Sequence, residues 1–161
     1  MNRQRIFTWG IFIAVVAILV GLDLWLKSWA ATNLMGQDNR VLIPSLLGLT
    51  YTRNTGAAFG LLGGFDWSRW VLAILKILLM AGLLWFYNRL PQKRRTWLFR
   101  VPLILIFAGG VGNLVDRLVL GYVRDMLEFL FVNFPIFNLA DVFVVVGCIL
   151  GVVVMLVEDY P

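Results

Sequence analysis

Four long apolar runs dominate this sequence and limit the folds that are open to it. They cover residues 6–22, 70–87, 97–115 and 136–157. About 20 predominantly apolar residues allow an α-helix to cross the hydrocarbon core of a bilayer, and the first run lies at the short end of the usable range. With 61% hydrophobic residues and a mean hydropathy of +0.87, the chain is predicted to be a mainly α-helical membrane protein, one domain with four transmembrane helices.

The first apolar run has an alternative interpretation as the core of a cleaved signal peptide. Ser28-Trp29-Ala30 is a weak small-x-small cleavage site. Two features favour a retained helix instead. The run is longer than the usual core of a signal peptide, and Asp23 and Lys27 follow it at the i, i+4 spacing of one helical face.

Positively charged residues lie close to the ends of the apolar runs and predict how the chain is oriented. Arg3 and Arg5 precede the first run. A second group lies around the connection between the second and third runs: Arg89, Lys93, Arg94, Arg95 and Arg100. Because loops rich in Lys and Arg stay in the cytoplasm, both termini are expected there, with residues 28–69 on the outer side. The net charge of +5 therefore indicates topology, and we expect no nucleic-acid partner.

Residues 28–69 differ in character from the apolar runs. Glycines recur, Pro44 marks a turn, and short pieces rich in Leu, Thr and Tyr lie between them. These features predict short strands, with residues 41–43 and 47–52 paired in a small sheet on the outer membrane surface. The small residues at 54–60 favour either a close backbone approach to a ligand or helix, or an ordinary tight turn, and both interpretations stay open.

Polar side chains from distant parts of the sequence converge at the outer ends of the predicted helices. With the predicted topology, these residues fall on that side: Asp23, Asn54, Asp116, Asp125 and Asp141. An ionisable group at membrane depth costs on the order of 3 kcal/mol, so such groups indicate a functional site by default. The convergence therefore predicts a site at the outer membrane boundary.

The residue types present exclude most hydrolytic chemistries. The chain has no histidine, which excludes Ser-His-Asp and Cys-His arrangements, and its single cysteine, Cys148, excludes a disulfide framework. No spacing supports a metal site built from carboxylates alone. Asp125 and Asp141 remain as candidates for a shared site. Because two like charges a few ångströms apart cannot both ionise, one keeps its proton, and the pair can supply base and acid for amide hydrolysis.

Other polar residues are spaced to support such a site. Asn138 precedes Asp141 by three residues, so the two are predicted to share one face of a helix. Asn113, Asp116 and Arg117 are likewise spaced to share a helical face. This cluster either forms a local ion pair with an amide partner or orients a nearby catalytic loop. Since water is scarce in a bilayer, its members need partners within the protein.

Two further features concern the helices themselves. Glycines in the third and fourth runs predict close helix packing there: Gly109, Gly110, Gly112, Gly147 and Gly151. Lys76 lies six residues inside the second run, which is about 9 Å at 1.5 Å per residue. Its ammonium is expected to reach back to the near interface, with pairing to a carboxylate as the alternative.

Five short polar motifs are distributed over almost the whole chain. They are Asp23-x-x-x-Lys27, Asn54-x-Gly56-Ala57-Ala58-Phe59, Gly112-Asn113-x-x-Asp116-Arg117, Val123-x-Asp125 and Phe137-Asn138-x-Ala140-Asp141. Their order and spacing resemble those of the bacterial lipoprotein signal peptidases, also called signal peptidase II. On that resemblance, Asp125 and Asp141 match the catalytic aspartates. The residues that match polar positions supporting the site or binding substrate are Asn54, Asn113, Asp116, Arg117 and Asn138, while Asp23 and Lys27 match a structural motif.

The resemblance implies a fold with four transmembrane helices, a small extracytoplasmic β-cradle and a short surface helix. It implies an aspartic endopeptidase of the bacterial plasma (inner) membrane, with its active site at the outer face. Such an enzyme removes the signal peptide of a prolipoprotein on the N-terminal side of a diacylglyceryl-modified cysteine. No metal or cofactor is implied, the partners are the lipidated substrate and membrane lipids, and the working unit is taken to be a monomer.

Two functions of other classes are the alternatives to a peptidase. A small proton-coupled carrier would place its acids near the bilayer midplane, often with internal repeats or broken helices, whereas here the acids collect at one face and no repeat occurs. In a non-catalytic scaffold, the polar cluster would only hold the helices together. A scaffold would tolerate Asp→Asn at positions 125 and 141 with little loss.

Overall fold

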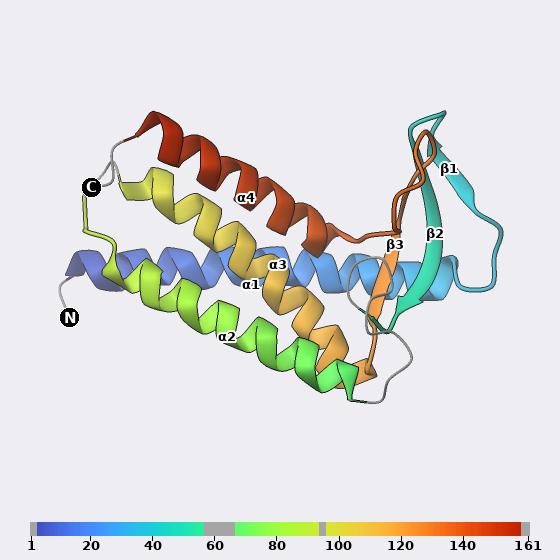
Figure 1. The fold of residues 1–161 in the computed structure, drawn as a ribbon, viewed down its shortest axis with the longest axis horizontal. Coiled ribbons are helices and arrows are strands. Elements are labelled where there is room, and N and C mark those ends of the chain that lie inside the picture. The colour runs from blue at the N-terminus through green and yellow to red at the C-terminus, as the bar shows by residue number, and fades with distance from the viewer. Residues whose placement is uncertain (1–2, 57–66, 94–95, 159–161) are drawn as a thin grey trace.

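The computed structural model describes residues 3–56, 67–93 and 96–158, and it consists of four long helices with a small sheet at one end (Figure 1). The helices are α1 (Arg3–Asn33), α2 (Ser68–Arg89), α3 (Trp97–Leu120) and α4 (Leu139–Val157). Each of them contains a stretch long and apolar enough to cross a membrane. The prediction of a mainly α-helical protein with four membrane-spanning helices is therefore confirmed.

The helices run back and forth between two ends of the molecule. α1 begins and α4 ends at the same end, where α2 also ends and α3 begins, and the sheet lies at the opposite end (Figure 1). The connection between α2 and α3 is therefore on the side of the two termini, as the charge pattern predicts. Which of the two ends faces the cytoplasm stays a prediction from the positions of the arginines and lysines.

The helix boundaries differ most from the predicted runs at three places, and by two or three residues at the start of α1 and at both ends of α2. α1 continues to Asn33, because residues 22–33 contain neither proline nor glycine, and the chain turns only near Gly36, where φ is 74°. α3 continues to Leu120 and ends at Gly121, whose φ of 83° is the left-handed conformation that glycine adopts most readily. α4 begins at Leu139 and not at residue 136. The β-rich segment is correspondingly shorter than residues 28–69.

The sheet has three antiparallel strands in the order β1-β2-β3: β1 (Arg40–Ile43), β2 (Leu47–Asn54) and β3 (Val123–Phe129). The predicted pairing of residues 41–43 with residues 47–52 is confirmed by the β1–β2 hairpin. β3 is a strand that the sequence analysis did not predict. Its register places Thr52 opposite Asp125 and Asn54 opposite Val123, so β3 brings a carboxylate from the second half of the chain to the end of β2.

The short surface helix implied by the resemblance is absent from the described part of residues 28–69. Residues 28–33 belong to α1, and turns and the β1–β2 hairpin occupy most of residues 34–54. Residues 57–66 lie outside the described residues. The predicted small-residue segment at 54–60 is accordingly described only as far as Gly56.

α3 and α4 approach each other closely, and glycine makes that approach possible. A Cβ atom at Gly109 would overlap the carbonyl oxygen of Ala140, and one at Gly147 would lie 2.9 Å from the carbonyl oxygen of Pro102. Backbone carbonyls cannot rotate away as side chains do. The close packing predicted from the glycines is therefore confirmed at these two positions, and it presses the start of α4 against α3.

Gly109→Ala is expected to lower the free energy of unfolding by about 2–3 kcal/mol, because the added methyl group overpacks a backbone contact. Gly110→Ala is the matched control. Its Cβ would meet Sδ of Met80 at 3.3 Å, a flexible side chain that can move aside, and alanine favours the helix by about 1 kcal/mol. Thermal unfolding in detergent compares the two variants, and equal losses of stability would contradict this account.

Candidate functional site

Lys27 stands at the centre of a buried polar cluster where α1, α3 and α4 meet. Its ammonium lies 2.7 Å from Oδ2 of Asp23, 2.8 Å from Oδ1 of Asn113 and 3.8 Å from Oδ2 of Asp116. Asp23 also accepts a hydrogen bond of 2.9 Å from the backbone N–H of Ala140, at the start of α4. The three charged side chains are at most 1% exposed. Asp23 and Lys27 thus connect three helices, which suits the structural role predicted for them.

Asp116 is paired with an arginine that the sequence analysis did not select. Arg124, on β3, donates to both carboxylate oxygens of Asp116, with Nη2 at 2.6 Å and Nε at 3.1 Å. Its Nη1 donates to Oγ of Ser28 on α1. The hydrogen bonds to Asp116 raise the pKa of Arg124 above its ordinary value. Asp116 therefore joins α3 to β3 and does not form the local ion pair with Arg117 that was one alternative.

Asp125 is buried on β3 and is held by two amides. Asn54, at the end of β2, donates from Nδ2 to Oδ2 of Asp125 at 3.0 Å, and Asn138 donates from Nδ2 to Oδ1 at 2.5 Å. Burial raises the pKa of Asp125 to about 6, and the charge of Asp141 acts in the same direction, whereas the two amide hydrogen bonds act against it. Asp125 is thus a carboxyl group whose pKa lies well above its ordinary value.

Asp141 and Asn138 form a capping box at the start of α4. Oδ1 of Asn138 accepts from the backbone N–H of Asp141 at 3.0 Å, and Oδ2 of Asp141 accepts from the backbone N–H of Asn138 at 3.1 Å. The predicted shared helical face is wrong, because Asn138 has extended backbone angles and precedes the helix. The two side chains are nevertheless adjacent. The other oxygen of Asp141, Oδ1, accepts from Nδ2 of Asn113 at 2.7 Å.

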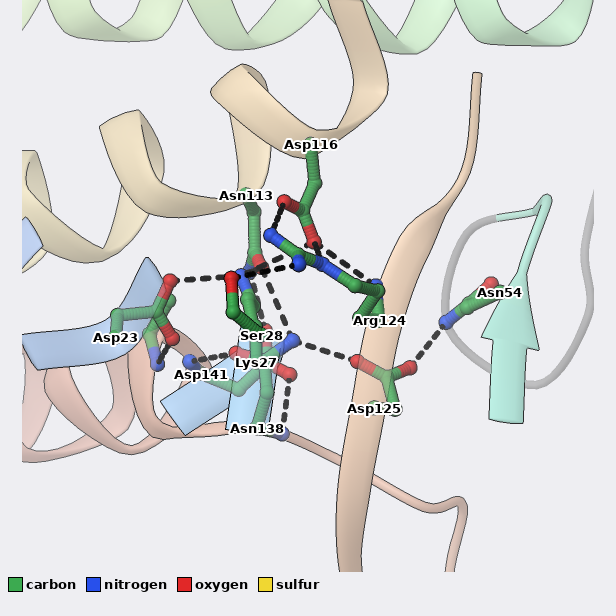
Figure 2. A network of polar contacts seen from close by, with 11 residues as sticks. Asp23, Lys27, Ser28, Asn54, Asn113, Asp116, Arg124, Asp125, Asn138 and Asp141 are labelled. Carbon is green, nitrogen blue, oxygen red and sulfur yellow. Dashed lines mark hydrogen bonds and ion pairs between the residues drawn. The ribbon is translucent and has the colours of Figure 1, made fainter. Parts of the chain in front are cut away.

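Two asparagines join the carboxyl groups of Asp125 and Asp141 into one network (Figure 2). Nδ2 of Asn138 donates to Oδ1 of Asn113 at 3.0 Å as well as to Asp125. Asn113 then donates its own N–H group to Asp141. Because Oδ1 of Asn113 also accepts from Lys27, the ammonium is linked to both carboxyl groups through amides.

A cavity of about 570 Å³ lies beside the network, a size typical of a small-ligand site. Its polar lining comes from six side chains: Asn54, Lys76, Asn113, Arg117, Asp125 and Asp141. The remaining wall is mostly aromatic and aliphatic, from β3, the segment between β3 and α4, and the first turns of α4. The carboxyl groups of the network therefore border a space with a largely apolar wall.

Arg117 contacts the end of the sheet from α3. Its Nη2 donates to the carbonyl oxygen of Gly56 at 2.9 Å, just after β2. Within residues 3–56, 67–93 and 96–158, its buried Nε and Nη1 atoms have no hydrogen-bond partner. Arg117 also lines the cavity, so its side chain joins the cavity wall to the backbone just after β2.

The structure thus brings together the residues that the sequence analysis selected from five separate motifs. Asp23, Lys27 and Asp116 are buried behind the cavity, and the other predicted site residues except Asn138 line it. Arg124 and Ser28 belong to the same network and were missed. The sequence carries only a weak indication of the role of Arg124. Gly121 is a residue type that commonly ends a helix, so the segment around Arg124 can be extended and not helical.

The arrangement supports general acid–base chemistry. Two carboxyl groups linked by amides, one with a pKa that burial raises to about 6, can supply a proton acceptor and a proton donor at one site. They border a cavity that can admit water and a substrate group. A perturbed carboxyl group in such a cavity is typical of a catalytic site.

Comparison with known proteins identifies the family of this chain. Residues 15–157 match the family model for signal peptidase (SPase) II. The chain is 38% identical over 147 residues to the lipoprotein signal peptidase of Streptococcus thermophilus, a match that covers 91% of this chain and 92% of that protein. It is also 38% identical over 149 residues to the lipoprotein signal peptidase of Enterococcus faecalis, covering 92% and 89% of the two chains.

The fold is likewise similar to solved structures. A bacterial membrane enzyme determined by the in meso method at 2.3 Å resolution superposes with a TM-score of 0.77 at 30% identity, covering 91% of this chain and 88% of that one. A second, determined at 1.9 Å, gives a TM-score of 0.76 at 31% identity and covers 93% and 94%. The chain therefore belongs to the signal peptidase II family of membrane enzymes, the lipoprotein signal peptidases.

Proposed function

We propose that the chain is an aspartic endopeptidase that removes the signal peptide of prolipoproteins on the N-terminal side of the diacylglyceryl-modified cysteine. One observation carries the proposal: Asp125 and Asp141 border one cavity and are linked through Asn113 and Asn138. The name shared by the relatives, lipoprotein signal peptidase, indicates the substrate class. No metal or cofactor has a part in the proposed reaction.

In the proposed reaction the two carboxyl groups share one proton. The ionised member takes a proton from water as the water oxygen attacks the scissile carbonyl carbon, and the protonated member donates to the carbonyl oxygen. The tetrahedral intermediate then collapses. The C–N bond breaks, and the proton taken from water passes to the leaving nitrogen. As the C=O bond re-forms, the proton given to the carbonyl oxygen returns to the carboxylate that donated it. Base and acid are roles of the pair as a whole, and neither role is assigned to one of the two aspartates.

The supporting residues act on the carboxyl groups or on the substrate. Asn54 and Asn138 hold Asp125, and Asn113 holds Asp141. Nε and Nη1 of Arg117, the two nitrogens without described partners, carry N–H donors suited to a carbonyl oxygen of the bound peptide backbone. Behind the cavity, the packing of α1 against α3 and α4 is stabilised by the ion pairs and hydrogen bonds of Asp23, Lys27 and Asp116.

The position of the cavity suits a substrate that is anchored in the membrane. Each buried methylene of an acyl chain contributes about 0.8 kcal/mol to anchoring, so a lipidated precursor must be cut at the membrane. The cavity lies at the sheet end of the helices, and the charge pattern assigns that end to the outer face of the plasma membrane. One chain supplies all the residues of the site, so the proposed working unit is a monomer surrounded by lipid.

The proposal is tested by mapping the cut made in a prolipoprotein. Purified protein in detergent is given the precursor with and without its diacylglyceryl group, and the products are identified by mass spectrometry. The expected result is one cut immediately before the lipidated cysteine and none in the unmodified precursor. A cut elsewhere, equal cutting of both precursors, or no cut in either would contradict the proposal.

Asn54→Ala is expected to move the alkaline limb of the pH profile of kcat/KM to higher pH by about one unit. The active pair holds one proton and loses it as pH rises through its upper apparent pKa. The N–H of Asn54 stabilises the ionised form of Asp125, so removing it raises that pKa, and one hydrogen bond is worth about 1 kcal/mol.

The matched control for this shift is Asn39→Ala. Asn39 also donates to a carboxylate on β3, Glu128, at 3.1 Å, but it is exposed and does not line the cavity. Its removal is expected to leave both limbs of the profile in place. If the alkaline limb of Asn54→Ala is unchanged or moves to lower pH, Asn54 does not stabilise the ionised form of Asp125.

A further inference from the structure

Lys76 lies in the wall of the cavity and has no part in the proposed mechanism. It is the sole charged residue between Trp70 and Asn88 in α2. Leu72, one helical turn earlier, lines the same cavity, so this face of α2 is turned toward it. A charged side chain in a membrane-spanning helix is costly, and it is retained where it meets a partner or a substrate.

No partner for Lys76 occurs in the described part of the chain. Its ammonium makes neither an ion pair nor a hydrogen bond there, in contrast to the ammonium of Lys27, which has Asp23 and Asn113 within 2.8 Å. Two acidic and two basic side chains act on the charge of Lys76 through space: Asp141, Arg117, Lys27 and Asp125. Among the residues that the structure describes, nothing occupies its three N–H donors, and they lie in the wall of the cavity.

The geometry of α2 directs these donors toward the reacting end of the cavity. Side chains of an α-helix lean toward its N-terminus, and α2 begins at the sheet end of the molecule (Figure 1). The Lys76 side chain therefore extends from the depth of the membrane toward the level of the carboxyl groups. An uncharged acceptor suits this position best, because the cavity already borders the charges of Asp125 and Asp141 and is otherwise largely apolar.

We propose that Lys76 is a substrate-binding residue whose ammonium donates a hydrogen bond to a carbonyl oxygen of the lipidated substrate. The inference rests on the proposed function and adds a contact to it. Two groups of the substrate carry such an oxygen near the scissile bond: the ester groups of the diacylglyceryl moiety and the extended peptide backbone. The contact exists before and during the reaction alike, so it acts on KM and leaves kcat nearly unchanged.

The test compares Lys76→Met and Lys76→Arg in cleavage of the lipidated precursor. Methionine keeps the length of the side chain without its charge or donors, and it is expected to raise KM at least about ten-fold with kcat within about two-fold. Arginine restores charge and donors and is expected to stay within about three-fold of wild type. The matched control is Leu78→Met, also in α2. Leu78 is 62% exposed and does not line the cavity, so this variant is expected to match wild type.

A second substrate identifies the oxygen. In a precursor with an ether-linked dialkyl group the ester carbonyls are missing while the peptide is unchanged. If Lys76 binds an ester carbonyl, the KM of wild type rises on the ether substrate by about as much as the KM of Lys76→Met rises on the ester substrate. The KM of Lys76→Met is then the same on both substrates. If Lys76 binds the backbone, the variant is impaired equally on both substrates.

Two results would overturn the inference about Lys76. An unchanged KM in Lys76→Met on both substrates overturns the inference, and so does a fall in kcat with a displaced pH profile, which would mean that Lys76 acts on the carboxyl groups. Because Lys76 has no described partner, Lys76→Met is expected to keep its thermal unfolding temperature, and Lys76→Gln provides a second uncharged variant. If wild type cuts neither substrate, the proposed function is refuted and the inference with it. If wild type cuts the lipidated precursor and Lys76→Met has the same KM and kcat, the inference alone is refuted.

Discussion

Asp125→Asn and Asp141→Asn are each expected to reduce cleavage of a lipidated prolipoprotein by at least about 10³-fold. An amide cannot take a proton from water, and it cannot share a proton with the remaining carboxyl group. Each substitution also replaces a carboxylate oxygen that accepts a hydrogen bond, Oδ1 or Oδ2, by an N–H donor. A loss of stability of about 1–3 kcal/mol is therefore expected as well. Initial rates and thermal unfolding curves of the same preparations separate the two effects.

Asp116→Asn is the matched control for these two variants. It makes the same chemical change in a buried carboxylate of the same network, but Asp116 does not line the cavity. It is expected to destabilise the protein at least as much, since it weakens the pairing with Arg124, and to reduce cleavage by less than about ten-fold at a temperature where all variants are folded. Near-wild-type cleavage by Asp125→Asn or Asp141→Asn would show that the two-aspartate mechanism is wrong.

Lys27→Met is expected to lower the free energy of unfolding by about 3–5 kcal/mol. The substitution leaves the carboxylate of Asp23 buried without a counter-ion, and the cost of an uncompensated buried charge is of that size. The carboxylate of Asp116 is less affected by the substitution, because it keeps its ion pair with Arg124. The unfolding transition in detergent, produced by heat or denaturant, measures this effect.

The double variant Asp23→Asn/Lys27→Met distinguishes the buried charge from lost packing. Asparagine removes the charge while its side-chain oxygen can still accept from the N–H of Ala140, so the double variant is expected to recover a large part of the stability lost in Lys27→Met. If the losses of the two single variants simply add, then the ion pair of Asp23 and Lys27 is not what holds α1 against α4.

The helices could be predicted from sequence because long apolar runs have few alternatives to crossing a membrane. Their ends were harder to predict. The apolar pattern of the first run stops at residue 22, but α1 continues to Asn33, since helix propensity and burial at the sheet end maintain it after the hydrophobic signal has ended. β3 was missed for a related reason: its pairing with β2 is a contact between segments about 70 residues apart, and local patterns do not report such contacts.

The members of the site were predictable in part because polar residues are rare in this chain. Asp125, Asp141 and their asparagines were selected by that rarity together with motif spacing, and the structure places them in one network. Arg124 was missed because an arginine next to a predicted membrane boundary is ordinary, and its bonds to Asp116 depend on the β3 strand. Lys76 was expected at the interface, and its place in the cavity wall depends on which face of α2 is turned inward.

The central claim is that Asp125 and Asp141 act as one unit, and the double variant Asp125→Asn/Asp141→Asn tests it most directly. The measurement is the single-turnover rate of cleavage of the lipidated precursor by the double variant and by each single variant. The account predicts that the double variant is within about ten-fold of the slower single variant, because either substitution alone already destroys the shared-proton pair. A loss in the double variant equal to the product of the two single losses would mean that the carboxyl groups contribute independently, and it would contradict the account.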